Sequence, residues 1–151
     1  MRTITMTLCA ILASVTTIFA ASHTTLADDK PISFDQLPAK AQSFINKYFA
    51  GEEVSHITYD RDALSADYDV RFLSGTEVEF DSNGEWKDID TRNGVVPAEL
   101  IPQAIAKYVK SNYPNRTITE ISRNHTHTEV TLNGGLELKF NKNHKLVEVD
   151  D

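Results

Sequence analysis

The chain has 151 residues and a formal net charge of −7, with 22 acidic against 15 basic side chains and a single cysteine. An acidic balance of this kind argues against binding to nucleic acid or to an anionic membrane, because basic side chains dominate recognition of both. One cysteine cannot form an internal disulfide or a cysteine-type zinc site, so packing must stabilise the folded part.

The first residues have the features of an export signal. Arg2 precedes an apolar stretch, Ile4–Ala21, that is too short and too rich in threonine for a good membrane span. Small residues between positions 20 and 27 offer cleavage sites. We therefore predict a signal peptide over residues 1–21, with an uncleaved anchor as the alternative, and a periplasmic or secreted protein. Cleavage would also remove Cys9, the only cysteine.

Residues 22–33 are small and polar, and they predict a flexible leader. After this leader, residues 34–92 and 97–151 resemble each other in sequence. Leu37-Pro38 and Ile101-Pro102 open two stretches that align without a gap, and the register returns after a shorter loop in the second stretch. Matched positions include Val70 with Val130, Gly75 with Gly135, Phe80 with Phe140, Trp86 with Leu146 and Ile89 with Val149. This similarity predicts a tandem repeat.

Each of the two stretches begins with a helical pattern and continues with alternating residues. Apolar residues recur at spacings of three and four after Leu37 and after Ile101, and Gly51 and Pro114 follow as stop signals. Alternation and turn residues then predict strands. These lie at Val54–Asp60, Asp67–Leu73, Thr76–Phe80, Trp86–Asp90, Thr117–Arg123, Thr128–Leu132, Leu136–Asn141 and Lys145–Val149.

The expected fold class is therefore α+β, as a tandem repeat of one helix plus a four-stranded antiparallel meander. In each unit the helix would cover one face of the meander and leave the other exposed. The pattern does not decide whether the two units share one sheet, and it does not give the oligomeric state. Exposed edge strands make pairing with another chain possible without requiring it.

A set of short sequences carries a resemblance to a known family. Leu-Pro opens the helix, Tyr-Asp-Val-Arg-Phe fills residues 68–72, and Gly-Thr-Glu-Val-Glu-Phe-Asp-Ser-Asn-Gly-Glu-Trp fills residues 75–86. This arrangement behind a signal peptide resembles the PepSY-like family, which is similar in fold to the β-lactamase inhibitory protein. The resemblance implies a small exported binding module. No residue of an inhibitory interface can be matched, so it does not imply inhibition of a β-lactamase.

The open sheet face offers the main candidate for binding. Asp69, Arg71, Glu77 and Glu79 would lie on the face that no helix covers, where they could complement a basic partner. Trp86 is a candidate aromatic anchor, although its match to Leu146 favours core packing instead. We therefore predict a non-enzymatic module that binds an envelope or secreted protein or peptide and that could modulate an envelope enzyme.

Signs of catalysis are weak in this sequence. It contains no Gly-x-Ser-x-Gly elbow, no His-Glu-x-x-His helix and no phosphate-binding glycine loop. Glu77 and Glu79 could act as acid and base, but a solvated strand face predicts the same two residues. We expect no enzyme, no cofactor, no nucleic-acid partner and no stable membrane insertion after the signal is removed.

A small-ligand or metal-binding periplasmic protein is the alternative function. His125 and His127 flank Thr126, and side chains two apart on a strand share a face, so they could provide two ligands for zinc or copper. A closed site needs further ligands that the sequence does not identify. Asp81, Asn83 and Glu85 resemble alternating calcium ligands but lack the later bidentate acid, so a turn explains them.

Overall fold

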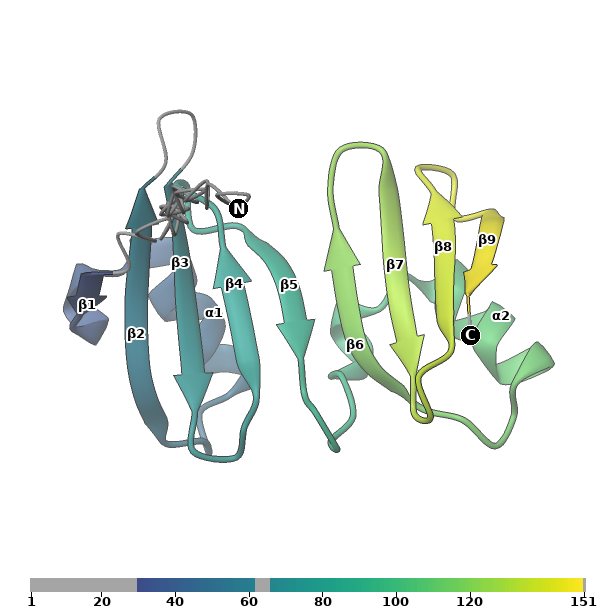
Figure 1. Ribbon diagram of the computed structural model, residues 1–151, viewed down its shortest axis with the longest axis horizontal. Coiled ribbons are helices and arrows are strands. Elements are labelled where there is room, and N and C mark those ends of the chain that lie inside the picture. The colour runs from purple at the N-terminus through teal and green to yellow at the C-terminus, as the bar shows by residue number, and fades with distance from the viewer. Residues whose placement is uncertain (1–29, 62–65, 151) are drawn as a thin grey trace, which may run out of the picture.

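The computed structural model describes residues 30–61 and 66–150 (Figure 1). The predicted signal peptide, its Cys9 and most of the leader lie outside the described residues. The end of the leader forms a short strand, β1 (Lys30–Ile32). Among the described residues, no helix is long and apolar enough to cross a membrane.

Two short helices, α1 (Ala39–Tyr48) and α2 (Gln103–Asn112), account for the helical patterns. A 3-10 turn precedes each of them, η1 (Phe34–Gln36) and η2 (Ala98–Leu100). Pro38 and Pro102 occupy the two N-cap positions, where the φ of −53° that both adopt suits a proline ring and no intrahelical N–H bond is lost. Each helix therefore starts where its Leu-Pro or Ile-Pro pair predicts.

The described residues contain nine strands in one antiparallel sheet, and their order in space is their order in sequence. After β1 they are β2 (Val54–Arg61), β3 (Ala66–Phe72), β4 (Glu77–Phe80), β5 (Trp86–Asp90), β6 (Ile118–Arg123), β7 (His127–Leu132), β8 (Glu137–Asn141) and β9 (Leu146–Asp150). The individual strands lie close to the predicted positions.

The predicted fold class is wrong. The sequence similarity led us to expect a tandem of two helix-plus-four-strand units, whereas the described residues form a single nine-stranded sheet with only two short helices. The sheet is continuous because β5 pairs with β6, which joins Asp88–Asp90 to Glu120–Ser122. Strand β1 also lies outside the predicted units and extends the sheet beyond β2. A pattern of apolar residues defines individual strands but does not define which strands pair across a connection.

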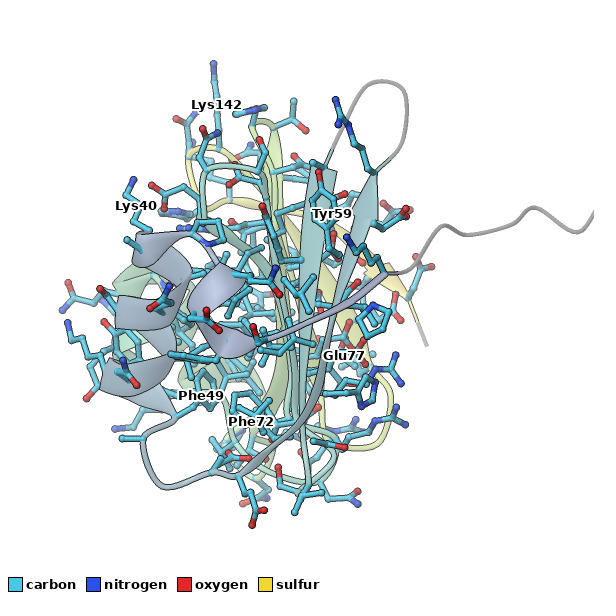
Figure 2. All side chains as sticks on the ribbon, turned by 90° about the vertical axis from the view of Figure 1, so that its left-hand side faces the viewer. Lys40, Phe49, Tyr59, Phe72, Glu77 and Lys142 are labelled. Atoms are coloured by element: carbon cyan, nitrogen blue, oxygen red, sulfur yellow. The ribbon has the colours of Figure 1, made fainter. Side chains whose placement is uncertain are left out.

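Both helices lie on the same face of this sheet (Figure 1). The core lies between them and the sheet, where Phe80 and Phe140 are fully buried. Phe44 of α1 meets Phe80 edge to face at 5.5 Å, and Tyr108 of α2 meets Phe140 in the same way at 5.5 Å. Figure 2 shows α1 on one side of the sheet, with Glu77 on the other side. Among the described residues, no helix therefore lies over the second face.

Candidate partner-binding surface on the open face

Five carboxylates gather at the centre of the open face. Alternation positions them there because their strand neighbours Val78, Ile89 and Ile121 are fully buried in the core. Glu77 lies opposite Asp90, which in turn lies opposite Glu120, and Glu79 lies opposite Asp88. We call Glu77, Glu79, Asp88, Asp90 and Glu120 the acidic face; they belong to the adjacent strands β4, β5 and β6.

The acidic face has an excess of negative charge, and its effect is clearest in the pKa of Asp88. Burial raises the pKa of Asp88 to about 7, and the charges of Glu120, Glu79, Asp90 and Glu77 add to the effect. Burial likewise raises the pKa of Glu120, against the opposing effect of a 3.1 Å hydrogen bond from the Thr131 hydroxyl. Arg92 forms an ion pair with Asp90 at 3.6 Å, so the uncompensated like charges at this centre are those of Asp88 and Glu120.

Basic side chains flank the acidic face rather than neutralise its centre. An Nη atom of Arg71 lies 2.7 Å from Glu77, and Lys87 pairs with Glu79 and, at 3.2 Å, with Asp67. Burial opposes ionisation of Lys87, but these two hydrogen bonds raise its pKa overall. Within the described part of the chain, no cation forms an ion pair with Asp88 or Glu120.

The structure brings together four of the five predicted partner-binding residues. Asp69 lies opposite Glu79 and Arg71 lies opposite Glu77, all on the open face. Trp86 lies apart from them: it is 8% exposed, and its ring is 6.3 Å from that of Phe44 on the helix-covered side. Its small exposed area leaves little ring for a partner to contact.

Sequence reasoning missed Asp88, Asp90 and Glu120. The alternation of Asp88 and Asp90 about buried Ile89 could have placed the two aspartates on the open face, although the register shift at Glu79/Phe80 puts Trp86, two residues before Asp88, on the opposite face. No local signal could have added Glu120, because it joins the cluster only through the pairing of β5 with β6.

Trp86 and Arg123 form a second, smaller feature where β5 and β6 diverge. The guanidinium carbon of Arg123 lies 3.7 Å from the centroid of the Trp86 ring, and Nε of Arg123 donates to the Trp86 carbonyl oxygen at 3.0 Å. Burial lowers the pKa of Arg123, although Glu85 and Asp81 oppose this. Arg123 thus covers the ring beside a hollow of about 490 Å³ that Asn124 and His125 also line.

The two candidate metal-binding histidines have different surroundings. His127 begins β7, with Nε2 3.0 Å from the Asn124 amide nitrogen and Nδ1 2.9 Å from the Thr126 hydroxyl, whereas His125 lies in the preceding turn. The described ranges contain no group of three or more histidine, cysteine or acidic side chains arranged to hold a metal ion. His125 and His127 therefore have no third ligand of these types beside them.

The calcium-like sequence at residues 81–85 forms a turn. Oδ1 of Asp81 accepts hydrogen bonds from the backbone N–H groups of Asn83 at 2.8 Å and Glu85 at 2.9 Å. Burial acts to raise the pKa of Asp81, but these backbone donors outweigh it and lower the pKa. The Asp81 carboxylate thus stabilises the turn in which it lies.

Comparison with known proteins defines the class of this fold. The family described as "Putative beta-lactamase-inhibitor-like, PepSY-like" matches residues 66–148, and the chain belongs to this PepSY-like family. Its predicted membership is thereby confirmed. A search of curated proteins finds no match.

Three solved structures, all from Bacteroides, are similar over nearly their whole length. A "putative periplasmic protein from DUF2874 family" of Bacteroides vulgatus is 36% identical, with a TM-score of 0.80 over 83% of this chain and 99% of that one. A "putative calcium-regulated periplasmic protein" of Bacteroides thetaiotaomicron is 40% identical, with a TM-score of 0.80 over 82% and 98%. A "putative periplasmic protein of unknown function" of Bacteroides vulgatus is 38% identical, with a TM-score of 0.78 over 82% and 99%. These relatives confirm the predicted periplasmic or secreted location.

Proposed function

We propose that the protein is a non-catalytic periplasmic module that binds a basic protein or peptide through the acidic face. The observation that carries this proposal is the cluster of five carboxylates on three adjacent strands, with Asp88 held at a pKa of about 7. Lysine or arginine side chains of a partner would relieve the repulsion within this cluster. Such binding would allow the module to modulate an envelope enzyme.

The raised pKa of Asp88 gives this binding a pH dependence. A basic partner favours the ionised carboxylate, whose fraction increases as the pH rises through about 7. Affinity should therefore increase between about pH 6 and pH 8, and the Asp88→Asn variant should lose most of that increase.

Affinity capture from native envelope extract tests the proposal. The purified chain, the Glu77→Gln/Glu79→Gln/Asp88→Asn variant and a control variant would each serve as bait. The control, Glu52→Gln/Glu53→Gln/Glu99→Gln, removes the same number of carboxylates from positions outside the acidic face. A partner recovered by the parent and the control, but lost by the acidic-face variant, supports the proposal. Equal recovery by both variants, or recovery of nothing, contradicts it.

Metal binding is the second candidate, and one relative favours it because that protein is described as calcium-regulated. Carboxylates are the side chains that calcium prefers, but the five of the acidic face are not arranged as a preformed metal site. Calorimetric titration with calcium, zinc and copper separates the possibilities. Calcium binding that the acidic-face variant loses would support a cation site there, whereas zinc or copper binding lost in His127→Ala would support the histidine pair.

A further inference from the structure

The two edges of the sheet differ in how they meet solvent. At one edge β1 has three residues, and Pro31 at its centre has no N–H to donate to another strand. At the other edge β9 has five residues without a proline, and among the described strands it pairs only with β8. Strand β9 therefore has main-chain donors and acceptors available for a further strand.

Exposed apolar side chains also mark this edge. Val147 is 58% exposed and Val149 is 46% exposed, and both lie in β9. Val149 lies opposite Leu138, which is fully buried in the core, so Val149 belongs to the helix-covered face of the sheet. An added strand would shield Val149 by placing an apolar residue beside it.

The charges at the same edge indicate which side chains an added strand would need at every second position. Glu148 lies opposite Lys139 and Asp150 lies opposite Glu137, on the open face. These four residues and Glu129 line a hollow of about 130 Å³, in which one lysine meets four carboxylates. Lys139 pairs with Glu148 at 3.3 Å and with Glu129 at 3.6 Å. Basic side chains beside Glu148 and Asp150 would complement the remaining charge.

We propose that β9 binds an extended peptide in which basic and apolar residues alternate, by adding it as a tenth strand. Main-chain hydrogen bonds hold the peptide, its basic side chains meet Glu148 and Asp150, and its apolar residue covers Val149. A second copy of this chain fits less well, because antiparallel pairing of two β9 strands brings glutamate and aspartate together in a chain of net charge −7. This site is separate from the acidic face and does not depend on its function.

Fluorescence anisotropy with a labelled Lys-Val-Lys-Val-Lys peptide tests this site. A Lys-Lys-Lys-Val-Val peptide has the same charge without the alternation, and a copy N-methylated at alternate residues lacks one row of donors. We expect the alternating peptide to bind about tenfold more tightly than either at about 0.15 M salt, where charge alone acts only over short distances. Equal binding of the alternating and rearranged peptides overturns the proposal.

Variants locate the site. Val149→Lys should lower the affinity for the alternating peptide about tenfold. The added positive charge repels a basic peptide, and the apolar contact with Val149 is lost. Leu73→Lys is the matched control: Leu73 is 65% exposed but lies after β3, away from this edge. Because the probe is itself basic, both variants are compared in the Glu77→Gln/Glu79→Gln/Asp88→Asn background, which removes the acidic face as a competing site. Unchanged affinity in Val149→Lys overturns the proposal, as does a Val149-dependent dimer with which the peptide does not compete.

Discussion

Strands β5 and β9 have similar local structures but differ in burial. Each follows a tight turn and pairs with the preceding strand through a register shift, at Glu79/Phe80 for β5 and at Lys139/Phe140 for β9. Yet Ile89 of β5 is fully buried, whereas Val149 of β9 is 46% exposed. The difference arises because β6 pairs with β5, while no described strand follows β9. Burial of an alternating strand thus depends on its neighbours as much as on its own pattern.

The largest expected contrast is between the aromatic and aliphatic residues that begin the two strands. Trp86→Ala should destabilise the protein by about 3–5 kcal/mol, because it removes a buried ring. Leu146→Ala should cost about 1 kcal/mol, because Leu146 is only partly buried at the sheet edge. Urea unfolding followed by circular dichroism measures both. Equal losses would mean that the edge position does not reduce packing around Leu146.

The turns before β5 and β9 offer the next contrast. Gly84 has a φ of +77°, and a Cβ there would lie 2.8 Å from Cβ of Pro38 at the start of α1. Gly84→Ala should therefore cost about 2–3 kcal/mol. His144 also has a positive φ, of 54°, but it is exposed. His144→Gly should change the stability by less than about 1 kcal/mol, since it relieves backbone strain but frees the unfolded chain.

Thermal and urea unfolding of these two turn variants would decide whether contact with the helix or backbone strain dominates. A loss in Gly84→Ala no larger than about 1 kcal/mol would mean that α1 moves aside easily. A gain of several kcal/mol in His144→Gly would mean that the strain at position 144 is much larger than its left-handed φ implies.

The smallest contrast concerns two acids at matched places, Asp88 opposite Glu79 and Glu148 opposite Lys139. The folded-state pKa of Asp88, about 7, lies above its ordinary value of 3.8. The folded state therefore binds more protons between these values, and the stability that Asp88 contributes falls as the pH rises through that window. Asp88→Asn should stabilise the protein at pH 8 by about 1 kcal/mol, after discounting for solvent screening, and by less at pH 4.

Glu148→Gln is the control for Asp88→Asn. It removes an exposed ion pair with Lys139 and should destabilise the protein by at most about 0.5 kcal/mol. Unfolding curves at pH 4, 6 and 8 compare the two variants. A pH-independent effect of Asp88→Asn would contradict the assigned pKa, and a gain in stability from Glu148→Gln would mean that the edge carries uncompensated charge as well.

Much of the local structure follows from the sequence alone. The Leu-Pro and Ile-Pro pairs predicted where α1 and α2 begin, and alternation predicted the strands of the meanders and the outward direction of Asp69, Arg71, Glu77 and Glu79. These features are local, because helix and strand periods act over a few residues. The family resemblance rested on the same local patterns.

The way in which the strands combine depends on tertiary contacts. Pairing of β5 with β6 made one nine-stranded sheet where two units were expected, buried Ile89, and brought Glu120 beside Asp88 and Asp90. It also brought Arg123 over Trp86, and the order of the strands left β9 at an edge. These outcomes depend on contacts between residues far apart in sequence, which no local periodicity encodes.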